Sequence, residues 1–488
     1  MDLPADQVSG PRIGVLVVAY NAQSTLEATL NRIPVGFRSQ ITEIIIADDA
    51  SEDDTYGAAL RWRSANMDTS TTVVRHLENR GYGGNQKAGY RMAIERGLDV
   101  VVLLHADGQY APECMPQMVT PILAGKADAV FGSRMLVPGA ARSGGMPAYK
   151  YIGNKILSRA ENLVLGTSLS EFHSGYRAYA VKALADLPFE ENTDEFDFDT
   201  QIIVQLVDAG KRILEIAVPT YYGEEICYVN GMKYAKDVLR DVLQYRTSKM
   251  GFGTAKWVPN AHDYGLKQEE GSSHTIILDL LRDTPPGKVL DVGCSSGLLS
   301  SQIREMGHHV VGVDYVEEPG VQERVDEFVS ADLDEGLPDV GGEYDVVIAA
   351  DIIEHVRKPE ALLVDMANKL SPSGRLLIST PNFGHWYPRM RVASGTFDYD
   401  RRGILDETHL RFFTRRGLLR TLASARLTVE ELRYTGLPMG VVNPAAKSRV
   451  SLGLTRLDSL LVRMRPTFFG YQFVAVLRPK NYESVSHP

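Results

Sequence analysis

Residues 41–55 read ITEIIIADDASEDDT, an apolar and β-branched run that passes directly into a cluster of acids and small polar residues. The run predicts a buried strand over 41–47, and the polar cluster predicts a turn and a helix that begins after Asp53. Continuous apolar strands separated by helices predict an α/β fold with a doubly wound parallel sheet. The same alternation surrounds this stretch, with strands expected at 13–19, 72–76 and 100–105, and helices at 24–32, capped by Ser24, and at 85–96.

The alternation begins again in the second half of the chain, after an irregular stretch. Residues 249–274 contain glycines, a proline and polar residues without periodicity, which indicates a linker or an entry arm. The sequence therefore predicts two doubly wound domains, at 12–248 and 275–480, with short tails at 1–11 and 481–488. Strands of the second domain are expected at 288–292, 310–314, 344–350 and 375–380.

The length and net charge of the chain limit the classes of protein to which it can belong. A chain of 488 residues exceeds what one hydrophobic core usually serves, which agrees with two domains. A net charge of -10 argues against a surface built for nucleic acid or for anionic lipid, since both need basic patches. The three cysteines are widely spaced, and the sequence shows neither a signal-peptide pattern nor a run of about 20 apolar residues. We expect a cytoplasmic protein and leave peripheral contact with the inner face of a membrane open.

Polar side chains gather after three strands of the first domain. Tyr20 follows the first strand, Asp49 and Asp53 follow the second, and Asp107 follows the fourth. Ligands of parallel sheets bind beyond the carboxyl ends of the strands, where carboxylates suit ribose hydroxyls and a base edge. An acid after the fourth strand also suits a divalent cation that would neutralise a leaving diphosphate. The alternative is a capped helix start at 48–55 and a simple turn after Asp107.

Six segments of the first half make a more specific prediction. They are VVAYNAQSTLEATL, IIIADDASEDDT, NRGYGGNQKAGYRMA, LLHADGQYAPE, FGSR and HSGYRAY. They occur in the order seen in family 2 glycosyltransferases. The region 12–242 resembles the branch of that family that contains dolichol-phosphate mannosyltransferase and related polyprenyl-phosphate sugar transferases. The resemblance implies a GT-A fold, an NDP-sugar donor, Mg2+ or Mn2+, inversion at the anomeric carbon, and a polyprenyl-phosphate or glycan acceptor.

The resemblance also implies roles for single residues. A nucleoside contact, a metal ligand and two phosphate clamps are expected, and guanidinium groups suit the last task because they bind phosphate with two parallel hydrogen bonds. In this assignment Tyr20, Asp49 and Asp53 face the nucleoside, Asp107 ligates the metal, and Arg134 and Arg177 hold phosphate groups.

Two positions depart from the family pattern. His105 stands where the family has the first acid of the metal motif, which leaves Asp107 as the sole carboxylate of that tripeptide. Glu171 stands where this branch more often has aspartate. A carboxylate there could act as a base or orient the acceptor, and a surface salt bridge is an equal alternative.

The second half of the chain contains another group of candidate binding residues, around VLDVGCSSG at 289–297. A predicted strand ends in a turn whose Gly293 and Gly297 let a ligand approach the backbone. Asp314 ends the next strand, 23 residues after Asp291, and an acid at about this spacing suits two ribose hydroxyls. Asp332 ends a third segment, where it could accept a hydrogen bond from an adenine amino group.

Together with the polar tip at 351–355, this set resembles class I S-adenosylmethionine-dependent methyltransferases over 264–480. The resemblance implies a Rossmann-like sheet of seven strands, closed by strands at 427–433 and 471–477. A nicotinamide-binding domain is the local alternative, but the turn is not G-x-G-x-x-G. The implied contacts are Asp291, Gly293 and Gly297 at the methionine end, Asp314 at the ribose, and Asp332 with Leu333 at the adenine.

The irregular, aromatic and basic segment 381–414 is expected to cap the acceptor site. It contains GILDETHLRFFT, which is similar to segments of ubiquinone-biosynthesis-type and sugar-associated methyltransferases. His409 is our preferred catalytic base, followed by His355 and His385, because histidine titrates near neutral pH. A structural or substrate-positioning role is the alternative for each of the three.

Two sites in one chain predict a bifunctional enzyme that adds a sugar and then methylates an oxygen of the glycan or glycolipid. Two alternatives remain open. The replacement by His105 could mark a degenerate domain that only binds glycan and delivers it to the methyltransferase. The two enzymes could also be independent and fused only for joint expression.

Overall fold

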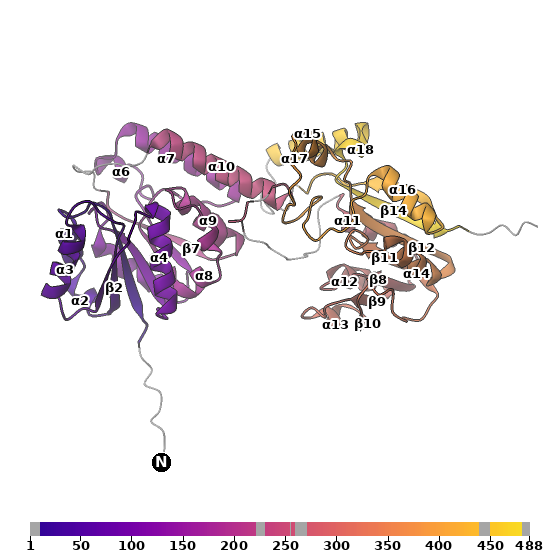
Figure 1. Cartoon of the computed structure of the whole chain (residues 1–488), viewed down its shortest axis with the longest axis horizontal. Coiled ribbons are helices and arrows are strands. Elements are labelled where there is room, and N and C mark those ends of the chain that lie inside the picture. The colour runs from indigo at the N-terminus through magenta and orange to yellow at the C-terminus, as the bar shows by residue number, and fades with distance from the viewer. Residues whose placement is uncertain (1–9, 221–229, 254, 259–270, 439–448, 481–488) are drawn as a thin grey trace, which may run out of the picture. The chain divides into compact units, whose positions relative to one another are not determined.

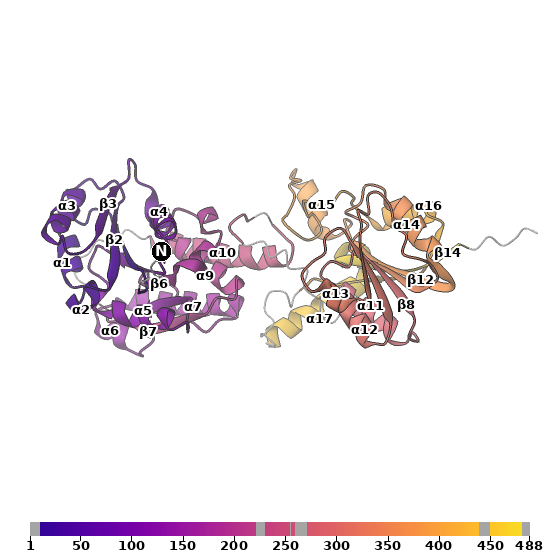
Figure 2. The same cartoon turned by 90° about the horizontal axis from the view of Figure 1, so that it is seen from below.

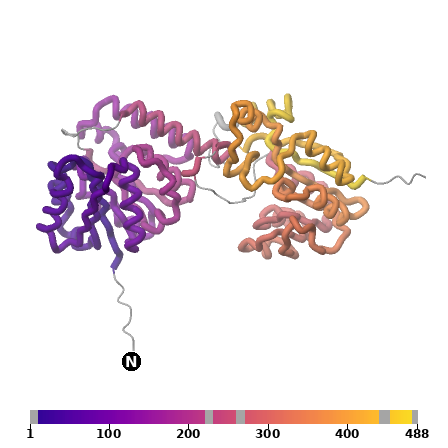
Figure 3. Tube along the Cα trace, in the orientation of Figure 1, coloured from indigo at the N-terminus to yellow at the C-terminus, as the bar shows by residue number. Residues whose placement is uncertain are grey.

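The computed structural model of the chain divides into two compact units (Figure 1, Figure 3). The first unit contains residues 1–246 and 255–259, and the second contains residues 247–254 and 260–488. The C-terminal tail, most of the N-terminal tail and much of the predicted linker lie outside the residues that the structure describes. The structure describes residues 10–220, 230–253, 255–258, 271–438 and 449–480.

The first unit is built on a seven-stranded sheet with strand order β3-β2-β1-β4-β6-β5-β7. Neighbouring strands are parallel, except that β6 runs antiparallel to both β4 and β5. The first apolar run of the chain forms the interior strand β1, between β2 and β4, whose side chains are almost all buried. The strands are β1 (Ile13–Ala19), β2 (Ile41–Asp48), β3 (Thr71–Arg75), β4 (Val100–His105), β5 (Ala129–Ser133), β6 (Arg177–Ala180) and β7 (Ile213–Ala217).

Helices cover both faces of this sheet (Figure 2). One core cluster joins the sheet to α1, α2, α3 and α5, and the other joins it to α4, α7, α8, α9 and α10. The elements are α1 (Leu26–Asn31), α2 (Val35–Arg38), α3 (Thr55–Ala65), α4 (Gly81–Glu95), α5 (Met115–Leu123), α6 (Ala140–Ser143), α7 (Ala148–Leu165), α8 (Val181–Ala185), α9 (Phe198–Asp208) and α10 (Gly231–Lys249), with 3-10 turns η1 (Pro112–Cys114) and η2 (Phe189–Glu191).

The second unit also has a seven-stranded sheet, with strand order β10-β9-β8-β11-β12-β14-β13. The first five strands are parallel, and β14 lies antiparallel between β12 and β13. This insertion of the last strand between the fifth and sixth closes the sheet. The strands are β8 (Lys288–Val292), β9 (His309–Asp314), β10 (Glu327–Ser330), β11 (Tyr344–Ala350), β12 (Leu370–Pro381), β13 (Leu427–Tyr434) and β14 (Gln472–Pro479).

Two core clusters again lie on the two faces of the sheet. Apolar side chains of α11, α12 and α13 fill one face, and those of α14 and α16 fill the other. The helices are α11 (Ser273–Arg282), α12 (Leu298–Glu305), α13 (Val321–Arg324), α14 (Pro359–Asn368), α15 (Trp386–Ala393), α16 (Arg415–Ser424), α17 (Arg449–Met464) and α18 (Pro466–Phe469).

These two sheets confirm the predicted fold class, a GT-A-type domain followed by a seven-stranded Rossmann-like domain. The predicted cap of α1 was wrong. Residues 22–25 form a hydrogen-bonded turn instead, with the Thr25 N–H donating to the Ala22 carbonyl at 3.1 Å, so the helix begins at Leu26 and no side chain caps it. Helix α4 begins at Gly81, four residues earlier than expected, because Gly81 adopts a left-handed φ of 80° at the turn into the helix.

Within the described residues, no helix is both long enough and apolar enough to cross a bilayer.

Two candidate active sites

The register of the first sheet brings the predicted polar residues of three strands to one edge. Ala19 pairs with Asp48, and Val18 pairs with His105. The backbone continues this alignment past the strands, since the Asp49 N–H donates to the Ala19 carbonyl at 2.9 Å. Tyr20, Asp49 and Asp107 therefore follow adjacent strands at the same edge of the sheet.

Asp49 is the buried carboxylate of this edge. Its side chain is only 4% exposed, and one carboxylate oxygen accepts a hydrogen bond from the Arg80 N–H at 2.7 Å. Burial raises the pKa of Asp49, although the Arg80 N–H partly opposes the rise. Tyr20, at the end of β1, is the more exposed of the two. The pair offers an aromatic face and a hydrogen-bond acceptor, the groups that a nucleobase needs.

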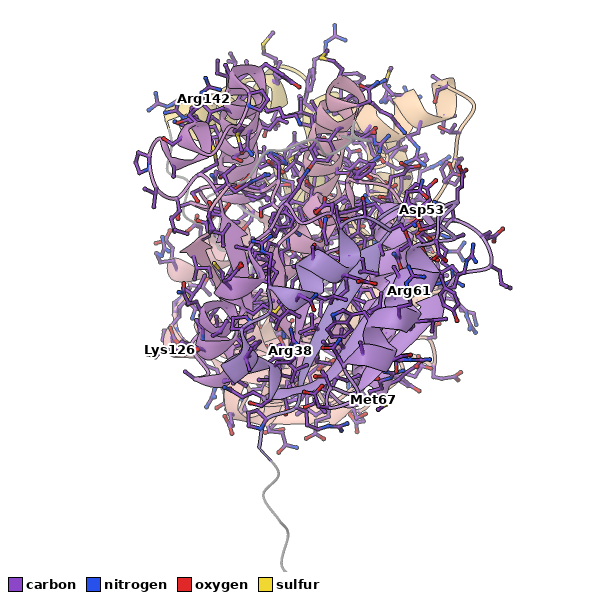
Figure 4. All side chains as sticks on the ribbon, turned by 90° about the vertical axis from the view of Figure 1, so that its left-hand side faces the viewer. Arg38, Asp53, Arg61, Met67, Lys126 and Arg142 are labelled. Carbon is purple, nitrogen blue, oxygen red and sulfur yellow. The ribbon has the colours of Figure 1, made fainter. Side chains whose placement is uncertain are left out.

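Asp53 (Figure 4) is held by several hydrogen bonds from neighbouring groups of the protein. One oxygen accepts from the N–H and the hydroxyl of Thr55, and the other accepts from the Gln23 N–H at 3.1 Å. Partial burial alone would raise the pKa of Asp53, but these hydrogen bonds hold the pKa below its usual value. Asp53 therefore ties the loop after β1 to the start of α3, although no side chain caps this helix.

The tripeptide after β4 combines an exposed carboxylate with a half-buried imidazole. Asp107 is exposed and accepts a hydrogen bond from the Gln109 N–H at 3.0 Å, so the predicted turn is present. His105 packs edge-on against the rings of Tyr82 and Tyr110, at 5.6 and 5.2 Å. Burial lowers the pKa of His105, and the nearby Asp107 only partly offsets this. A neutral imidazole and a carboxylate thus stand two residues apart.

Gly175 lies so close to His105 that no side chain would fit at this position. A Cβ atom at Gly175 would lie 2.7 Å from the His105 ring and 2.8 Å from the Tyr82 hydroxyl. The Tyr82 hydroxyl in turn donates to Asp199 at 2.8 Å. The sequence reasoning did not single out Tyr82 or Asp199, although Tyr82 stands in one of the segments that it quoted.

Arg177 does not lie where the sequence placed it. Its side chain is 1% exposed, and its guanidinium donates to the carbonyls of Ser174, Phe172 and Asp199 at 2.9–3.0 Å. It also lies 3.3 Å from the Asp199 carboxylate and over the Phe131 ring. Groups in the interior of the unit therefore hold this guanidinium on several sides. Arg177 is not free to form a phosphate clamp with Arg134.

Arg134 and Glu171 form a buried pair. Glu171 is 2% exposed and accepts from the Arg134 backbone N–H at 2.7 Å, from its guanidinium, and from Asn154 at 2.8 Å. Burial alone would raise the pKa of Glu171, but the Arg134 cation and these hydrogen bonds hold it below its usual value. The salt bridge that the sequence allowed for Glu171 is therefore present, but it is not a surface pair, since Glu171 is buried and Arg134 is half-buried.

A cavity of about 360 Å³ opens next to the Asp107 turn. Arg32, Gln109, Ala111, Pro219 and Thr220 line it. Arg32 reaches over this turn, donating to the Gly108 carbonyl at 3.1 Å while it pairs with Glu113.

The second sheet gathers its glycine turn and acids at one edge in the same way. Asp291 pairs with Ile348 and Val292 pairs with Val313, so β8, β9 and β11 end together. The Gly293 N–H donates to the Val313 carbonyl at 2.8 Å, and the Ser295 N–H donates to the Asp314 carboxylate at 2.7 Å. Asp314 therefore closes the turn that carries the two predicted glycines.

Both predicted glycines have left-handed backbones. Gly293 has a φ of 78°, and a Cβ atom there would lie 2.5 Å from the side chain of Ile352. Gly297 has a φ of 73° and stands directly before α12. The N–H groups of Gly293 and Gly297 are themselves bonded, to the Val313 and Cys294 carbonyls, so the groups that suit a bound carboxylate or phosphate are the first N–H groups of α12.

Asp291 lies beneath this turn. It is buried and accepts from the Ser300 hydroxyl at 2.5 Å. Burial, with a smaller contribution from Asp314, raises its pKa to about 6.

Asp332 and Leu333 follow β10. Asp332 is exposed and accepts from the Asp334 N–H at 2.9 Å, whereas Leu333 is half-buried against the sheet core.

Side chains of β12 and β14 hold the tip after β11 in place. Asp351 has a left-handed φ of 56° and accepts from the Ser379 hydroxyl at 2.6 Å and from the Gln472 amide at 3.0 Å. Ser379 belongs to β12 and Gln472 to β14. The sequence reasoning missed both, because the register of the antiparallel β14 cannot be read from the pattern of one strand.

Three side chains come together just beyond this tip. One ligand-type atom each of Glu354, His355 and His409 lies within 4.8 Å of the others, and the two imidazole rings are 4.8 Å apart. Burial and the neighbouring His355 lower the pKa of His409. The preferred base candidate therefore stands in a cluster, together with the second candidate His355.

His385, the third candidate, has a structural position. It is fully buried, accepts from the Tyr387 N–H at 3.3 Å as the cap of α15, and stacks on Phe252 at 6.0 Å. Burial lowers its pKa to about 3. It lies in an aromatic cluster with Tyr471 and does not join His409.

Comparison with known proteins agrees with the two sites described above. It identifies one transferase domain in each unit. Residues 14–187 match the profile of glycosyl transferase family 2, and residues 268–432 match that of a methyltransferase domain. The chain belongs to glycosyl transferase family 2 through its first unit and carries a methyltransferase domain in its second, so it contains both enzyme classes.

Individual relatives match one unit each. The undecaprenyl-phosphate mannosyltransferase of Micrococcus luteus is 31% identical over 210 residues, which cover 42% of this chain and 82% of the relative. A UDP-N-acetylglucosamine–dolichyl-phosphate N-acetylglucosaminyltransferase of Methanococcus voltae is 27% identical, covering 43% of this chain and 86% of the relative. The ubiquinone biosynthesis O-methyltransferase of Aeromonas salmonicida is 29% identical, covering 32% of this chain and 71% of the relative.

Proposed function

We propose that the chain is a bifunctional transferase. The first unit transfers a sugar from a nucleoside diphosphate sugar to a polyprenyl phosphate or a glycan, and the second transfers a methyl group from S-adenosylmethionine to a sugar oxygen. The observation that carries this proposal is that each sheet gathers its candidate residues at the carboxyl ends of its central strands. Two of the relatives are named for a polyprenyl-phosphate acceptor, which supports that choice.

In the sugar-transfer step, Tyr20 and Asp49 contact the nucleoside. The donor set after β4 fits a divalent cation, since Asp107 offers an exposed carboxylate and His105 a neutral imidazole. Mg2+ or Mn2+ bound there supplies positive charge to the leaving diphosphate. Asp53 holds the loop that positions Tyr20.

Arg134 contacts a phosphate group, and Glu171 positions it. The low pKa of Glu171 and its hydrogen bonds to Arg134 make it a poor proton acceptor. A phosphate acceptor is already ionised, so this reaction needs little base. Arg177 positions the site indirectly. It pairs with Asp199, which accepts a hydrogen bond from Tyr82, and Tyr82 in turn contacts His105.

In the methyl-transfer step, the chain mainly orients the two reactants. The turn between Gly293 and Gly297 holds the methionine end of the cofactor above Asp291, Asp314 accepts from the ribose, and Asp332 with Leu333 borders the adenine. Methyl transfer is an in-line displacement at a sulfonium, so correct placement supplies much of the rate. His409 belongs to the group that activates the acceptor hydroxyl.

A polyprenyl phosphate is reached from a membrane surface, and α7 has a suitable face. Tyr149, Ile152 and Ile156 are exposed on it at helical spacing, and the exposed Lys155 and Arg159 flank them. Such a helix can lie in a lipid interface and attract anionic headgroups. We infer peripheral contact of the first unit with a membrane. Flotation with anionic vesicles tests this, and Ile152→Glu with Ile156→Glu should abolish it.

The second candidate function is a glycan-binding first unit that serves an active methyltransferase. The observation that favours it is the single carboxylate at 105–107. A panel of nucleotide sugars, incubated with the purified chain and Mg2+ or Mn2+, separates the two functions. Slow release of NDP from one donor, lost in Asp107→Ala, supports the transferase. If no donor is bound or hydrolysed, the binding function is correct.

A further inference from the structure

Helices α16 and α17 of the second unit are both amphipathic, but they turn opposite faces to solvent. In α16, Leu418 and Leu422 are buried in the core beside the sheet, which is the usual arrangement of a surface helix. In α17, Leu457, Leu460 and Met464 are 52%, 54% and 69% exposed. This helix lies at the periphery of the unit and not against its sheet (Figure 2). Its apolar side chains therefore face away from the core.

The exposed apolar side chains of α17 form one continuous face. Leu454, which is 43% exposed, continues the set, and the four side chains recur every three or four residues, so they lie on the same side of the helix. Another side of the helix holds it to the unit. Val462 is buried there, and the Asp458 carboxylate accepts the Leu437 N–H at 3.0 Å. The apolar face is therefore not the face by which the helix is attached.

The exposed charges that border this apolar face are positive. Arg456 and Arg463 are both exposed and lie two helical turns apart on one side of the helix. The sequence of α17 has one acid, Asp458, which its hydrogen bond turns towards the unit. The whole chain carries a net charge of -10, but this surface is locally basic. Its charge complements an anionic partner.

The length of α17 limits what kind of partner it can have. The helix has 16 residues, and at 1.5 Å per residue it is about 24 Å long. A helix needs about 20 apolar residues to span a bilayer, so α17 is too short and too charged to do so. A strongly amphipathic helix with arginines beside its apolar face instead lies in the plane of a lipid interface.

We propose that α17 docks the second unit on a membrane surface that contains anionic phospholipids. The leucine and methionine side chains enter the boundary between headgroups and acyl chains, and the two guanidinium groups bind lipid phosphates. This surface is separate from the exposed face of α7, which belongs to the first unit, and it depends on neither transfer reaction. We call it the α17 surface, and its residues are Leu454, Arg456, Leu457, Leu460, Arg463 and Met464.

The competing occupant of the α17 surface is a second copy of the chain. A twofold dimer through this face would place the same side chains of both copies against each other. Arg456 and Arg463 would then gather like charges along one contact, and the helix has no outward acid to pair with them. Such repulsion disfavours the dimer. Lipid phosphates, in contrast, neutralise the same charges.

Two membrane surfaces on one chain reinforce each other, because binding of one raises the effective concentration of the other at the lipid. A single weak anchor binds reversibly, and stable attachment takes two. Loss of either surface should therefore weaken binding strongly. The α17 surface is tested by its own substitutions, in a chain whose α7 is intact.

The test is a titration of the full-length chain with two kinds of vesicle, phosphatidylcholine alone and an equal mixture with phosphatidylglycerol, followed by sedimentation. We expect binding to the mixed vesicles, and this binding should weaken as the salt concentration rises. Leu457→Ser with Leu460→Ser should weaken it about 100-fold or more, because both side chains lose most of their apolar area. Arg456→Gln with Arg463→Gln should weaken it roughly 10- to 30-fold, the combined contribution of two cations near an anionic surface.

Matched controls change the same kinds of side chain elsewhere on the second unit. Arg416→Gln with Arg420→Gln removes two exposed cations from α16, the helix whose apolar face is buried. Val364→Ser removes an apolar side chain of α14 that is 38% exposed. Both variants should bind vesicles like the parent chain. Thermal melting shows whether each variant is folded.

No vesicle binding by the parent, binding that does not require phosphatidylglycerol, or equal binding by the parent and the folded leucine variant would overturn the proposal. A parent dimer that the leucine substitutions dissociate, with vesicle binding unchanged, would assign the face to a second copy of the chain instead. If the leucine variant does not fold, the arginine variant decides by the same comparison. Vesicle binding that depends on the α17 surface, without any transfer activity, would leave this proposal standing and refute the proposed function.

Discussion

The two candidate sites occupy equivalent edges of two similar sheets, yet they are built from different parts of the chain. The first depends on side-chain charge, from Asp49 and Asp107 at the edge to the Arg177–Asp199 pair behind it. The second depends on backbone shape, since its turn is made by Gly293 and Gly297. We conclude that substitutions which remove charge should damage the first site, and substitutions which add a Cβ atom should damage the second.

The largest effect is expected from the charge buried behind the first site. Arg177→Met should lower the free energy of unfolding of the first unit by about 3–5 kcal/mol, because it leaves the Asp199 carboxylate without its cation. The pair of the exposed Arg212 with Asp128 is the control, and Arg212→Met should leave the free energy of unfolding nearly unchanged. Chemical denaturation of both variants gives the comparison. If Arg177→Met is as stable as the control and loses donor binding instead, Arg177 is the phosphate clamp that the sequence suggested.

The next effect concerns the charge at the edge. Asp107→Ala should reduce sugar transfer by about 10²–10³-fold, the usual cost of losing one group that stabilises developing charge. Because Asp107 is exposed, the fold should not change, and methyl transfer should be unaffected. Asp68, exposed on the same unit, serves as the control in Asp68→Ala. Equal loss of both activities would show that the two sites are not independent.

A smaller effect is expected from a Cβ atom in the second site. Gly293→Ala introduces strain at a φ of 78° and overlaps Ile352, so S-adenosylmethionine should bind at least about tenfold more weakly. Gly307→Ala, at a φ of 92° with no atom closer than 3.5 Å, introduces strain without overlap. Both should lower stability by about 1–2 kcal/mol. Calorimetric titration distinguishes them, and similar cofactor affinity in both variants would contradict the backbone-shaped site.

The smallest effect depends on pH and comes from Asp291. Its pKa rises from 3.8 to about 6 on folding, so between these values the native state keeps a proton that the unfolded chain has lost. The stability this group contributes is therefore complete below about pH 4 and is lost as pH rises through 6. Asp291→Asn should stabilise the second unit by about 1–3 kcal/mol at pH 7 and change little at pH 4. Thermal melting at both values checks the sign, and a gain that is equal at both would disprove the raised pKa.

The strands of both units could be predicted from the sequence because their side chains are buried on both faces, which leaves continuous apolar runs. Strands β1, β4, β8 and β11 have the predicted bounds. The acids and glycines of the sites were also predictable, since they directly follow these runs. Position along a strand is a local property, so one chain segment suffices to read it.

Contacts that depend on how strands and loops far apart in the sequence pair with one another could not be predicted in this way. The four-residue β6 lies antiparallel between β4 and β5, and it takes Arg177 into the interior. In the second unit, β14 brings Gln472 to Asp351, and the loop before α16 brings His409 to Glu354. Each of these contacts joins segments that are separated in sequence and share no periodic signal.

The central claim is that two separate transfer sites act in one chain. Its most direct test is mass spectrometry of products from cell extract given the purified protein, a panel of nucleotide sugars and S-adenosylmethionine with a deuterated methyl group. The account predicts a polyprenyl-phosphate or glycan product that gains one sugar, and a labelled methyl on a sugar oxygen. Asp107→Ala should prevent the sugar gain, and Gly293→Ala should reduce the label. A labelled product without carbohydrate, or loss of the sugar gain in Gly293→Ala, would contradict it.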